Sequence, residues 1–191
     1  MGTTIYESAY FPETVNKWSL LPGGLFISDV LVSYLRKNFS LATNAKFTGI
    51  FGNSTGGRGA LLAAARDPKI FGAAGGVSGD YDPLSMPWDR LLTSVYGPHK
   101  NFQERWKNTD NLMEMAVNLK GIPVFLAHGE KDAVVEKEQT ILMALKLSKL
   151  EKEGGHYPRV NKLYPSKRHD WDCWRTALSD AMIFFDENLS K

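Results

Sequence analysis

The chain has 191 residues, a formal net charge of +2 and a single cysteine, Cys173. This length is sufficient to bury one continuous hydrophobic core, so we expect a single domain over residues 1–191. One cysteine excludes an internal disulfide and any metal site built from several cysteines. Because the basic residues are interspersed with acids and aromatics, we expect no nucleic acid partner.

The N-terminal stretch MGTTIYESAYF has neither the basic start nor the long apolar run of a secretory signal. No apolar run approaches the roughly 18 residues that a membrane span needs. We therefore expect a soluble chain with no signal peptide and no membrane association. The sequence leaves the cellular compartment open.

Short apolar runs bounded by glycine, proline or aspartate alternate with helical patterns along the chain, which is typical of a parallel α/β sheet. The first helical pattern runs from Ile27 to Leu35 and ends in a basic cluster. In chain order, the sequence then predicts a strand over 47–51, a helix over 55–66, strands over 71–77 and 122–127, a helix over 134–150, a strand over 160–164 and a last helix. The last helix is expected to bury Trp171, Trp174, Leu178, Met182 and Phe185.

The segment 83–120 joins two predicted strands over an unusually long distance and is rich in large apolar residues. Long connections between strands in such folds often form lids or pocket walls. We expect this role for 83–120, and the alternative is that its aromatics only pack an extra helix onto the body.

The stretch GIFGNSTGGRGAL places Ser54 between Gly52 and Gly56, after a predicted strand and before a predicted helix. A sharp turn from strand to helix strains the turning residue, and neighbours two places away are expected to lack bulk. The pattern GxSxG in this context predicts a nucleophile elbow that exposes the serine hydroxyl, with the amide of Thr55 directed at a developing oxyanion. The alternatives are a glycine-rich turn with an idle serine, or a phosphate-binding loop.

A nucleophilic serine requires a histidine base and an acid that orients it, in the chain order serine, acid, histidine. Asp132 lies in the loop HGEKD after the strand IPVFLA, and His169 lies in SKRHDW after the strand VNKLYP. Because the carboxyl ends of parallel strands lie along one edge of a sheet, we expect Ser54, Asp132 and His169 to meet there.

Other residues compete for these roles. His128 breaks the expected order and is expected to hydrogen-bond to the backbone of its loop, while Asp170 is expected to cap the last helix. Cys173 is expected to be a small packed residue. The remaining competitors are His99 and His156, expected at the surface, and Glu130, Asp80 and Asp82, which could replace Asp132 as the acid.

The motifs GNSTGGRGAL, FGAAGGVSG, HGEKD and RHDWDCW together resemble the putative esterase family of α/β-hydrolases, from about Tyr6 to Phe185. That family includes feruloyl esterases, the S-formylglutathione hydrolases of the esterase D group and the antigen 85 mycolyltransferases. The resemblance implies an α/β-hydrolase-type, mostly parallel sheet with helices on both faces, and a serine esterase that forms an acyl-enzyme. It places the nucleophile at Ser54, the acid at Asp132, the base at His169 and an oxyanion donor at the Thr55 amide.

The resemblance implies no metal and no organic cofactor. The family usually has methionine where Thr55 stands, which should alter the shape of the pocket more than its chemistry. The HDWxxW pattern is similar to esterases that act on feruloyl or acetyl groups of carbohydrates, so we expect a small-molecule ester, such as an acylated carbohydrate or an aromatic acyl ester. The candidates for the acyl or alcohol pocket are Trp88, Tyr96, Trp106 and Trp171, and for each the alternative is ordinary core packing.

Members of the family carry several strands before the nucleophile strand, and this chain is N-terminally incomplete by comparison. Because an open edge on a buried strand favours aggregation, we expect strand 47–51 to be paired, by a homo-oligomer, a partner segment or the N-terminal stretch TTIYESAYF. The chain would otherwise be a piece of a longer hydrolase. Alternative functions are an acyltransferase or thioesterase with the same machinery, or an inactive hydrolase-like binding domain.

Overall fold

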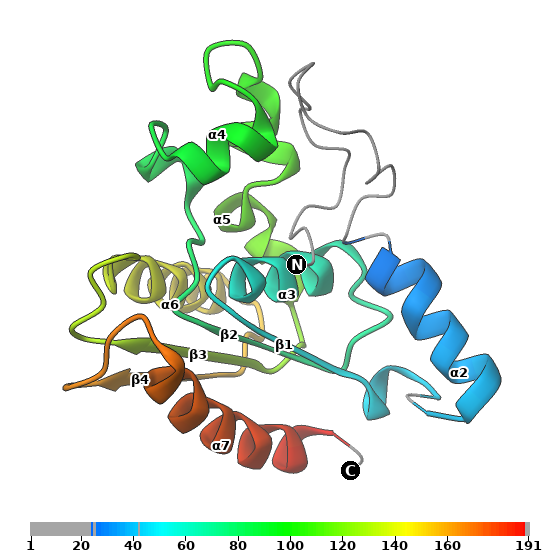
Figure 1. The fold of residues 1–191 in the computed structure, drawn as a ribbon. Helices are drawn as coiled ribbons and strands as arrows, with labels where there is room; N and C mark the ends of the chain where they lie inside the picture. The colour runs from blue at the N-terminus through cyan, green and yellow to red at the C-terminus, as the bar shows by residue number, and fades with distance from the viewer. Residues whose placement is uncertain (1–23, 25, 42, 190–191) are drawn as a thin grey trace.

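A computed structural model describes residues 24, 26–41 and 43–189 of the chain. Four parallel strands form one sheet in the order β1-β2-β3-β4 (Figure 1). The four predicted strands are confirmed to within two residues. They are β1 (Gly49–Asn53), β2 (Ala73–Val77), β3 (Val124–Gly129) and β4 (Arg159–Tyr164).

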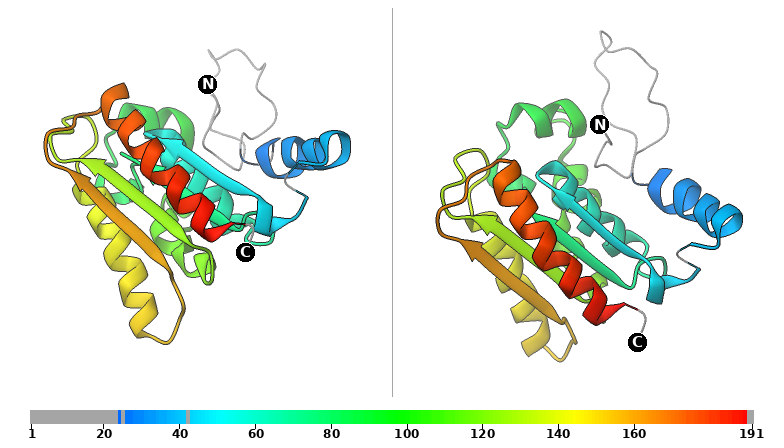
Figure 2. Two further views of the ribbon diagram at one scale, coloured as in Figure 1. Left: turned by 90° about the horizontal axis from the view of Figure 1, so that it is seen from below. Right: turned by 60° about the horizontal axis from the view of Figure 1, so that its bottom comes forward.

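Helices cover both faces of the sheet. Helices α3 (Thr55–Arg66) and α6 (Glu138–Lys152) lie on one face, and α7 (Trp171–Asn188) crosses the other (Figures 1 and 2). Side chains alternate between the two layers: Ala74 and Leu126 belong to the core beneath α3 and α6, whereas Ala73 and Phe125 belong to the core beneath α7. This two-sided burial explains why the strands read as continuous apolar runs.

Helix α3 packs unusually close to the sheet because glycines lie at its contact points. A Cβ added to Gly57 would lie 3.1 Å from the backbone nitrogen and oxygen of Val77, and one added to Gly76 would lie 3.0 Å from the carbonyl oxygen of Gly57. The close approach fixes the N-terminus of α3 at the carboxyl ends of β1 and β2.

Two predicted helix details are wrong. Helix α6 begins at Glu138 rather than at residue 134, because the residues before it form a loop around Asp132. Helix α7 turns a different face to the sheet: Trp171, Leu178 and Met182 are exposed. The sheet instead receives small residues at four-residue steps, followed by two phenylalanines, namely Cys173, Ala177, Ala181, Phe184 and Phe185.

The segment 83–120 stands above the face that carries α3 and α6 (Figure 1). It has a core of its own, formed by Leu92, Tyr96 and Trp106. The Tyr96 hydroxyl donates to the carbonyl of Asp110 at 2.8 Å, and Trp106 Nε1 donates to the carbonyl of Gly97 at 2.9 Å. Its elements are η3 (Pro83–Ser85), α4 (Arg90–Tyr96), η4 (Arg105–Thr109), α5 (Leu112–Met115) and η5 (Ala116–Leu119).

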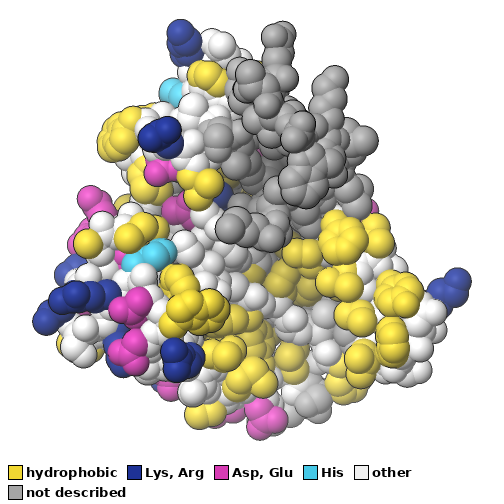
Figure 3. All heavy atoms as spheres, in the orientation of Figure 1, with side chains coloured by type: hydrophobic (Ala, Val, Ile, Leu, Met, Phe, Trp, Pro, Cys, Tyr) yellow, Lys and Arg dark blue, Asp and Glu magenta, His cyan; other side chains and the backbone are white. Residues whose placement is uncertain are grey.

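An N-terminal helical segment comprises η1 (Phe26–Val32) and α2 (Ser33–Phe39), and it lies beyond β1, where Val32 packs into the same core as α3 (Figure 1). The short helix η2 (Ala45–Phe47) precedes β1. Within the described residues, β1 pairs with β2 alone, so its outer edge has no described neighbour. Apolar side chains gather on the surface over α2 (Figure 3). The exposed ones in this part of the chain are Phe26, Val30, Leu31, Tyr34, Phe39, Leu41 and Phe47. No helix in the described part of the chain is both long and apolar enough to cross a membrane.

Pairing of the β1 edge stays a prediction, and light scattering tests it. If a second copy pairs there, the mass in solution is twice the chain mass of 21.3 kDa. Phe47→Glu should then give the monomer mass, because a charge next to an edge strand opposes pairing. Leu145→Glu, at a similarly exposed apolar position on α6, serves as the control. A stable wild-type monomer would contradict pairing by a second chain.

Candidate active site

Ser54 occupies a strained turn between β1 and α3. Its backbone has φ 55° and ψ −131°, a region that costs a residue with a side chain about 1–3 kcal/mol. Two hydrogen bonds hold this conformation: the Ser54 amide donates to the Val77 carbonyl at 2.8 Å, and the Gly57 amide donates to the Ser54 carbonyl at 2.8 Å. The turn therefore fixes the serine at the carboxyl edge of the sheet.

Only one of the two flanking glycines is required by space. A Cβ on Gly52 would overlap the backbone carbonyl of Gly56, whereas a Cβ on Gly56 would meet no described atom within 4 Å. The expectation that both positions must lack bulk is therefore wrong for Gly56. Its role is to bring its backbone close to Gly52, which any helical residue can do.

The structure brings Ser54, Asp132 and His169 together. Ser54 Oγ lies 2.9 Å from His169 Nε2, and Asp132 Oδ2 lies 2.7 Å from His169 Nδ1. An ionised Asp132 accepts the proton on Nδ1, so Nε2 presents a lone pair to the serine hydroxyl. Such a chain of hydrogen bonds can remove the proton from Ser54 as the oxygen attacks an electrophile.

Direct backbone hydrogen bonds join the loops that carry Asp132 and His169. The Lys131 amide donates to the carbonyl of Lys167 at 2.9 Å, and the Glu130 amide donates to the carbonyl of Tyr164 at 2.9 Å. Gly129 permits this approach, because a Cβ there would lie 2.5 Å from the carbonyl oxygen of Lys167. The spacing between Asp132 and His169 is thus set by the backbone.

Asp132 has a fully buried side chain that is held in its ionised form. Its Oδ1 accepts hydrogen bonds from the amides of Val134 and Val135, both at 2.9 Å. Burial alone would raise the pKa of this carboxyl, but hydrogen bonds from His128, His169 and the two amides outweigh burial and hold the pKa well below its ordinary range.

His128 contacts the loop that carries Asp132. Its Nε2 lies 2.9 Å from the carbonyl oxygen of Val135 and 3.2 Å from Asp132 Oδ2, so this nitrogen carries a proton shared between two acceptors. Nδ1 lies 2.8 Å from the hydroxyl of Thr140. The prediction that His128 binds the backbone of its loop is confirmed, and its contact with Asp132 adds to that prediction.

In the described part of the chain, none of the other candidate acids forms a hydrogen bond or ion pair with His169. Asp82 Oδ1 accepts the amide of Leu84 at the start of η3, and Asp80 pairs with Arg58. Within the described residues, no hydrogen bond joins Glu130 to the histidine. Asp170 caps α7 by accepting hydrogen bonds from the amides of Asp172 and Cys173, as predicted. Cys173 is buried on the face of α7 that packs against the sheet, which confirms the prediction that it is a packed residue.

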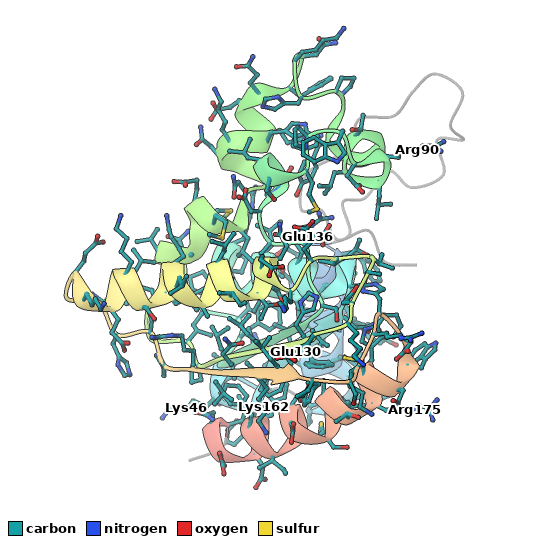
Figure 4. All side chains as sticks on the ribbon, turned by 90° about the vertical axis from the view of Figure 1, so that its left-hand side faces the viewer. Lys46, Arg90, Glu130, Glu136, Lys162 and Arg175 are labelled. Carbon is teal, nitrogen blue, oxygen red and sulfur yellow. The ribbon has the colours of Figure 1, made fainter. Side chains whose placement is uncertain are left out.

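A cavity of about 90 Å³ opens beside Ser54. Thr55, the first residue of α3, lines this cavity, and helix geometry leaves its amide without an intrahelical acceptor. A second cavity of about 410 Å³ shares several lining residues with the first and extends toward Trp88 and Glu136. Figure 4 shows Glu136 between the start of α6 and the helices of segment 83–120. The first cavity is lined by Ser54, Thr55, Asp80, Met86, Asp89, Leu91, Val134 and Val135.

The four aromatic pocket candidates have different positions. Trp88 lines the wider cavity and is 77% exposed. Trp171 is 65% exposed and packs edge-on against Trp174, whose ring in turn meets the ring of His169 at 5.3 Å between centroids. Tyr96 and Trp106 are fully buried in the core of segment 83–120 and line neither cavity, so for these two ordinary core packing is the correct reading.

Sequence reasoning missed the role of several side chains that line the cavity beside Ser54. Val134 and Val135 were predicted to be helical, and Asp80 was considered only as a substitute acid. A signal for Asp80 lay in Arg58, four residues after Ser54, because an arginine on the buried face of a helix requires an acidic partner. Within the described residues, no group of three or more His, Cys, Asp or Glu side chains could hold a metal ion.

Known proteins resemble this chain in sequence and in fold. The family model described as "Putative esterase" matches residues 8–185. Among solved structures, the chain is similar to an S-formylglutathione hydrolase from Agrobacterium tumefaciens, with 18% identity and a TM-score of 0.71. It is also similar to a ferulic acid esterase, with 17% identity and a TM-score of 0.68, and to a puromycin hydrolase, with 15% identity and a TM-score of 0.74.

These structures establish the α/β-hydrolase fold. The alignments cover 98%, 94% and 90% of this chain, respectively. They cover 64%, 63% and 26% of the solved chains, so this chain spans at most about two thirds of their length.

The two glycines of the turn should differ sharply in their tolerance of alanine. Gly52→Ala should lower the free energy of unfolding by at least about 2 kcal/mol, because its Cβ meets backbone that cannot move aside. Gly56→Ala should leave stability unchanged or raise it by up to about 1 kcal/mol, since alanine favours a helix. Urea unfolding of both variants measures the two free energies of unfolding. An equal loss of stability in the two variants would contradict the different surroundings of Gly52 and Gly56.

The lowered pKa of Asp132 should make the fold sensitive to acid. The contribution of Asp132 is present above the ordinary aspartate pKa of about 3.9 and is lost as pH falls toward the folded value, since the unfolded chain then binds the extra proton. Below pH 4, the free energy of unfolding of the wild type should therefore fall more steeply than that of Asp132→Asn, by up to about 1.4 kcal/mol per pH unit. Urea unfolding at a series of pH values measures the difference. Parallel curves for the two proteins would contradict it.

Proposed function

Since this chain belongs to the putative esterase family, we propose that it is a serine hydrolase that cleaves carboxylic esters through an acyl-enzyme intermediate. The observation that carries the proposal is the continuous hydrogen-bonded chain from Ser54 Oγ through His169 to Asp132, with distances of 2.9 and 2.7 Å. In this proposal, the three residues form a catalytic triad on a nucleophile elbow.

The reaction begins when Ser54 Oγ attacks the ester carbonyl and His169 Nε2 takes its proton. The amide of Thr55 donates to the oxyanion of the tetrahedral intermediate, a contribution of about 3 kcal/mol for one donor. His169 then protonates the departing alcohol, and Asp132 stabilises the imidazolium that exists between these steps. Water repeats the sequence on the acyl-enzyme and releases the acid.

The shape of the site supports an ester with a small group near Ser54 and a larger group beyond it. The cavity beside Ser54 is about 90 Å³, and the adjoining cavity is about 410 Å³. Trp88 presents an exposed ring at the wider cavity, and such a ring stacks on aromatic rings and on the apolar faces of sugars. An acylated carbohydrate or an aromatic acyl ester fits this arrangement.

Hydrolysis of 4-nitrophenyl butyrate tests the proposal. Ser54→Ala and His169→Ala should each lower kcat/KM by about 10³ or more, because removing either one disables the attack. Ser179→Ala, on the exposed side of α7, is the matched control. A fluorophosphonate probe should label Ser54 in the wild type, as shown by peptide mapping.

Full activity in Ser54→Ala would remove the assignment. Absence of both turnover and labelling in the folded wild type would favour the inactive binding domain. Products formed in the presence of glycerol or glutathione distinguish hydrolysis from acyl transfer.

A further inference from the structure

An ion pair is buried directly beside Ser54. Arg58, on α3, has no exposed surface, and Asp80, which follows β2, is 6% exposed. Arg58 Nη1 donates to Asp80 Oδ2 at 2.6 Å, and the guanidinium carbon lies 5.5 Å from the ring centroid of Tyr96. The pair is held at the junction between the sheet and the core of segment 83–120.

Among the described residues, the second oxygen of Asp80 has no hydrogen-bond partner. Oδ2 accepts from Arg58, but Oδ1 accepts nothing among the described residues and has essentially no solvent contact. A buried acceptor that lacks a donor is costly, so its position calls for an explanation. Asp80 lines the same cavity as Ser54 and Thr55, and a molecule bound in that cavity would supply the missing donor.

The charge of the pair indicates which donor fits. Arg58 balances the carboxylate, so the pair offers a hydrogen-bond acceptor with little net charge, which suits a neutral hydroxyl better than an ammonium group. Burial raises the pKa of the Asp80 carboxyl while Arg58 acts in the opposite direction, so an added donor would stabilise the ionised form. A carbonyl or ether oxygen would be repelled, because an ionised carboxylate only accepts hydrogen bonds.

We propose that Asp80 Oδ1 binds a hydroxyl group of the substrate, so that the enzyme prefers esters hydroxylated a few bonds from the scissile carbonyl. This inference rests on the proposed esterase function. Asp80 acts as a specificity-determining residue and takes no part in proton transfer, since His169 is already paired with Asp132. Met86 lines the cavity with Asp80, and its unbranched side chain can rotate to admit the hydroxyl.

Two matched ester series test the proposal. In the acyl series, 4-nitrophenyl butyrate is compared with its 3-hydroxy and 3-fluoro derivatives. In the alcohol series, ethyl butyrate is compared with 2-hydroxyethyl and 2-fluoroethyl butyrate. Fluorine is close in size to a hydroxyl group but cannot donate, and each kcat/KM is divided by the rate constant for uncatalysed hydroxide hydrolysis to remove electronic effects.

The hydroxyl compound should exceed its fluoro analogue at least tenfold in one of the two series, and that series identifies the side of the ester that meets Asp80. In Asp80→Asn the preference should fall below about threefold, because the charge-assisted hydrogen bond is lost. Asp89→Asn should keep the preference. Asp89 lines the same cavity and caps α4 through the amide of Leu92, and asparagine caps a helix equally well.

A wild-type enzyme without preference in either series would overturn the proposal, whether or not Asp80→Asn folds. An unchanged preference in a folded Asp80→Asn would also overturn it. If 4-nitrophenyl butyrate is not hydrolysed and Ser54 is not labelled, the proposed esterase function itself fails. If turnover occurs without preference, only this inference fails.

Discussion

The site depends on one close backbone contact, between Gly52 at the end of β1 and Gly56 in the first turn of α3. This contact lets a helix follow a strand with a single residue between them, and that residue, Ser54, takes the backbone strain. The hydrogen bond from Ser54 to Val77 ties the strained residue to the sheet. The sheet therefore holds Ser54 in its strained backbone conformation, and the Ser54 hydroxyl has little freedom to move.

Asp132 and His169 reach Ser54 because parallel strands end along one edge of the sheet. β3 leads to Asp132 and β4 leads to His169, and backbone hydrogen bonds between the two loops fix their spacing. Ser54 and His169 are 115 positions apart in the chain, yet their side chains meet at 2.9 Å. Only the short loops at the strand ends must be ordered for the site alone. Most of the conformational entropy lost in forming the site is therefore lost when the sheet itself folds.

The sequence predicted the features that arise from local patterns. Strands, the turn at Ser54 and the loops of Asp132 and His169 follow from apolar runs and glycines, and the four strands were placed to within two residues. The buried face of α7 was missed because small residues, Cys173, Ala177 and Ala181, pack closer to the sheet than the larger tryptophans could. A buried arginine indicates an acidic partner, but which acid pairs with Arg58 depends on tertiary contacts that no local pattern encodes. The same holds for the burial of Tyr96 and Trp106 within segment 83–120.

The energetics of the Arg58–Asp80 pair argue for a role beyond stability. Desolvating two charges costs several kcal/mol for each, and apolar side chains of similar volume often hold a core together as well or better. The cost is greatest when one oxygen stays unpaired, as Asp80 Oδ1 does within the part of the chain that the structure describes. In the wall of the cavity beside Ser54, a bound molecule can offset such a cost. The same carboxylate that weakens the isolated fold would then distinguish one ester from another, because a substrate without a donor leaves the penalty in place.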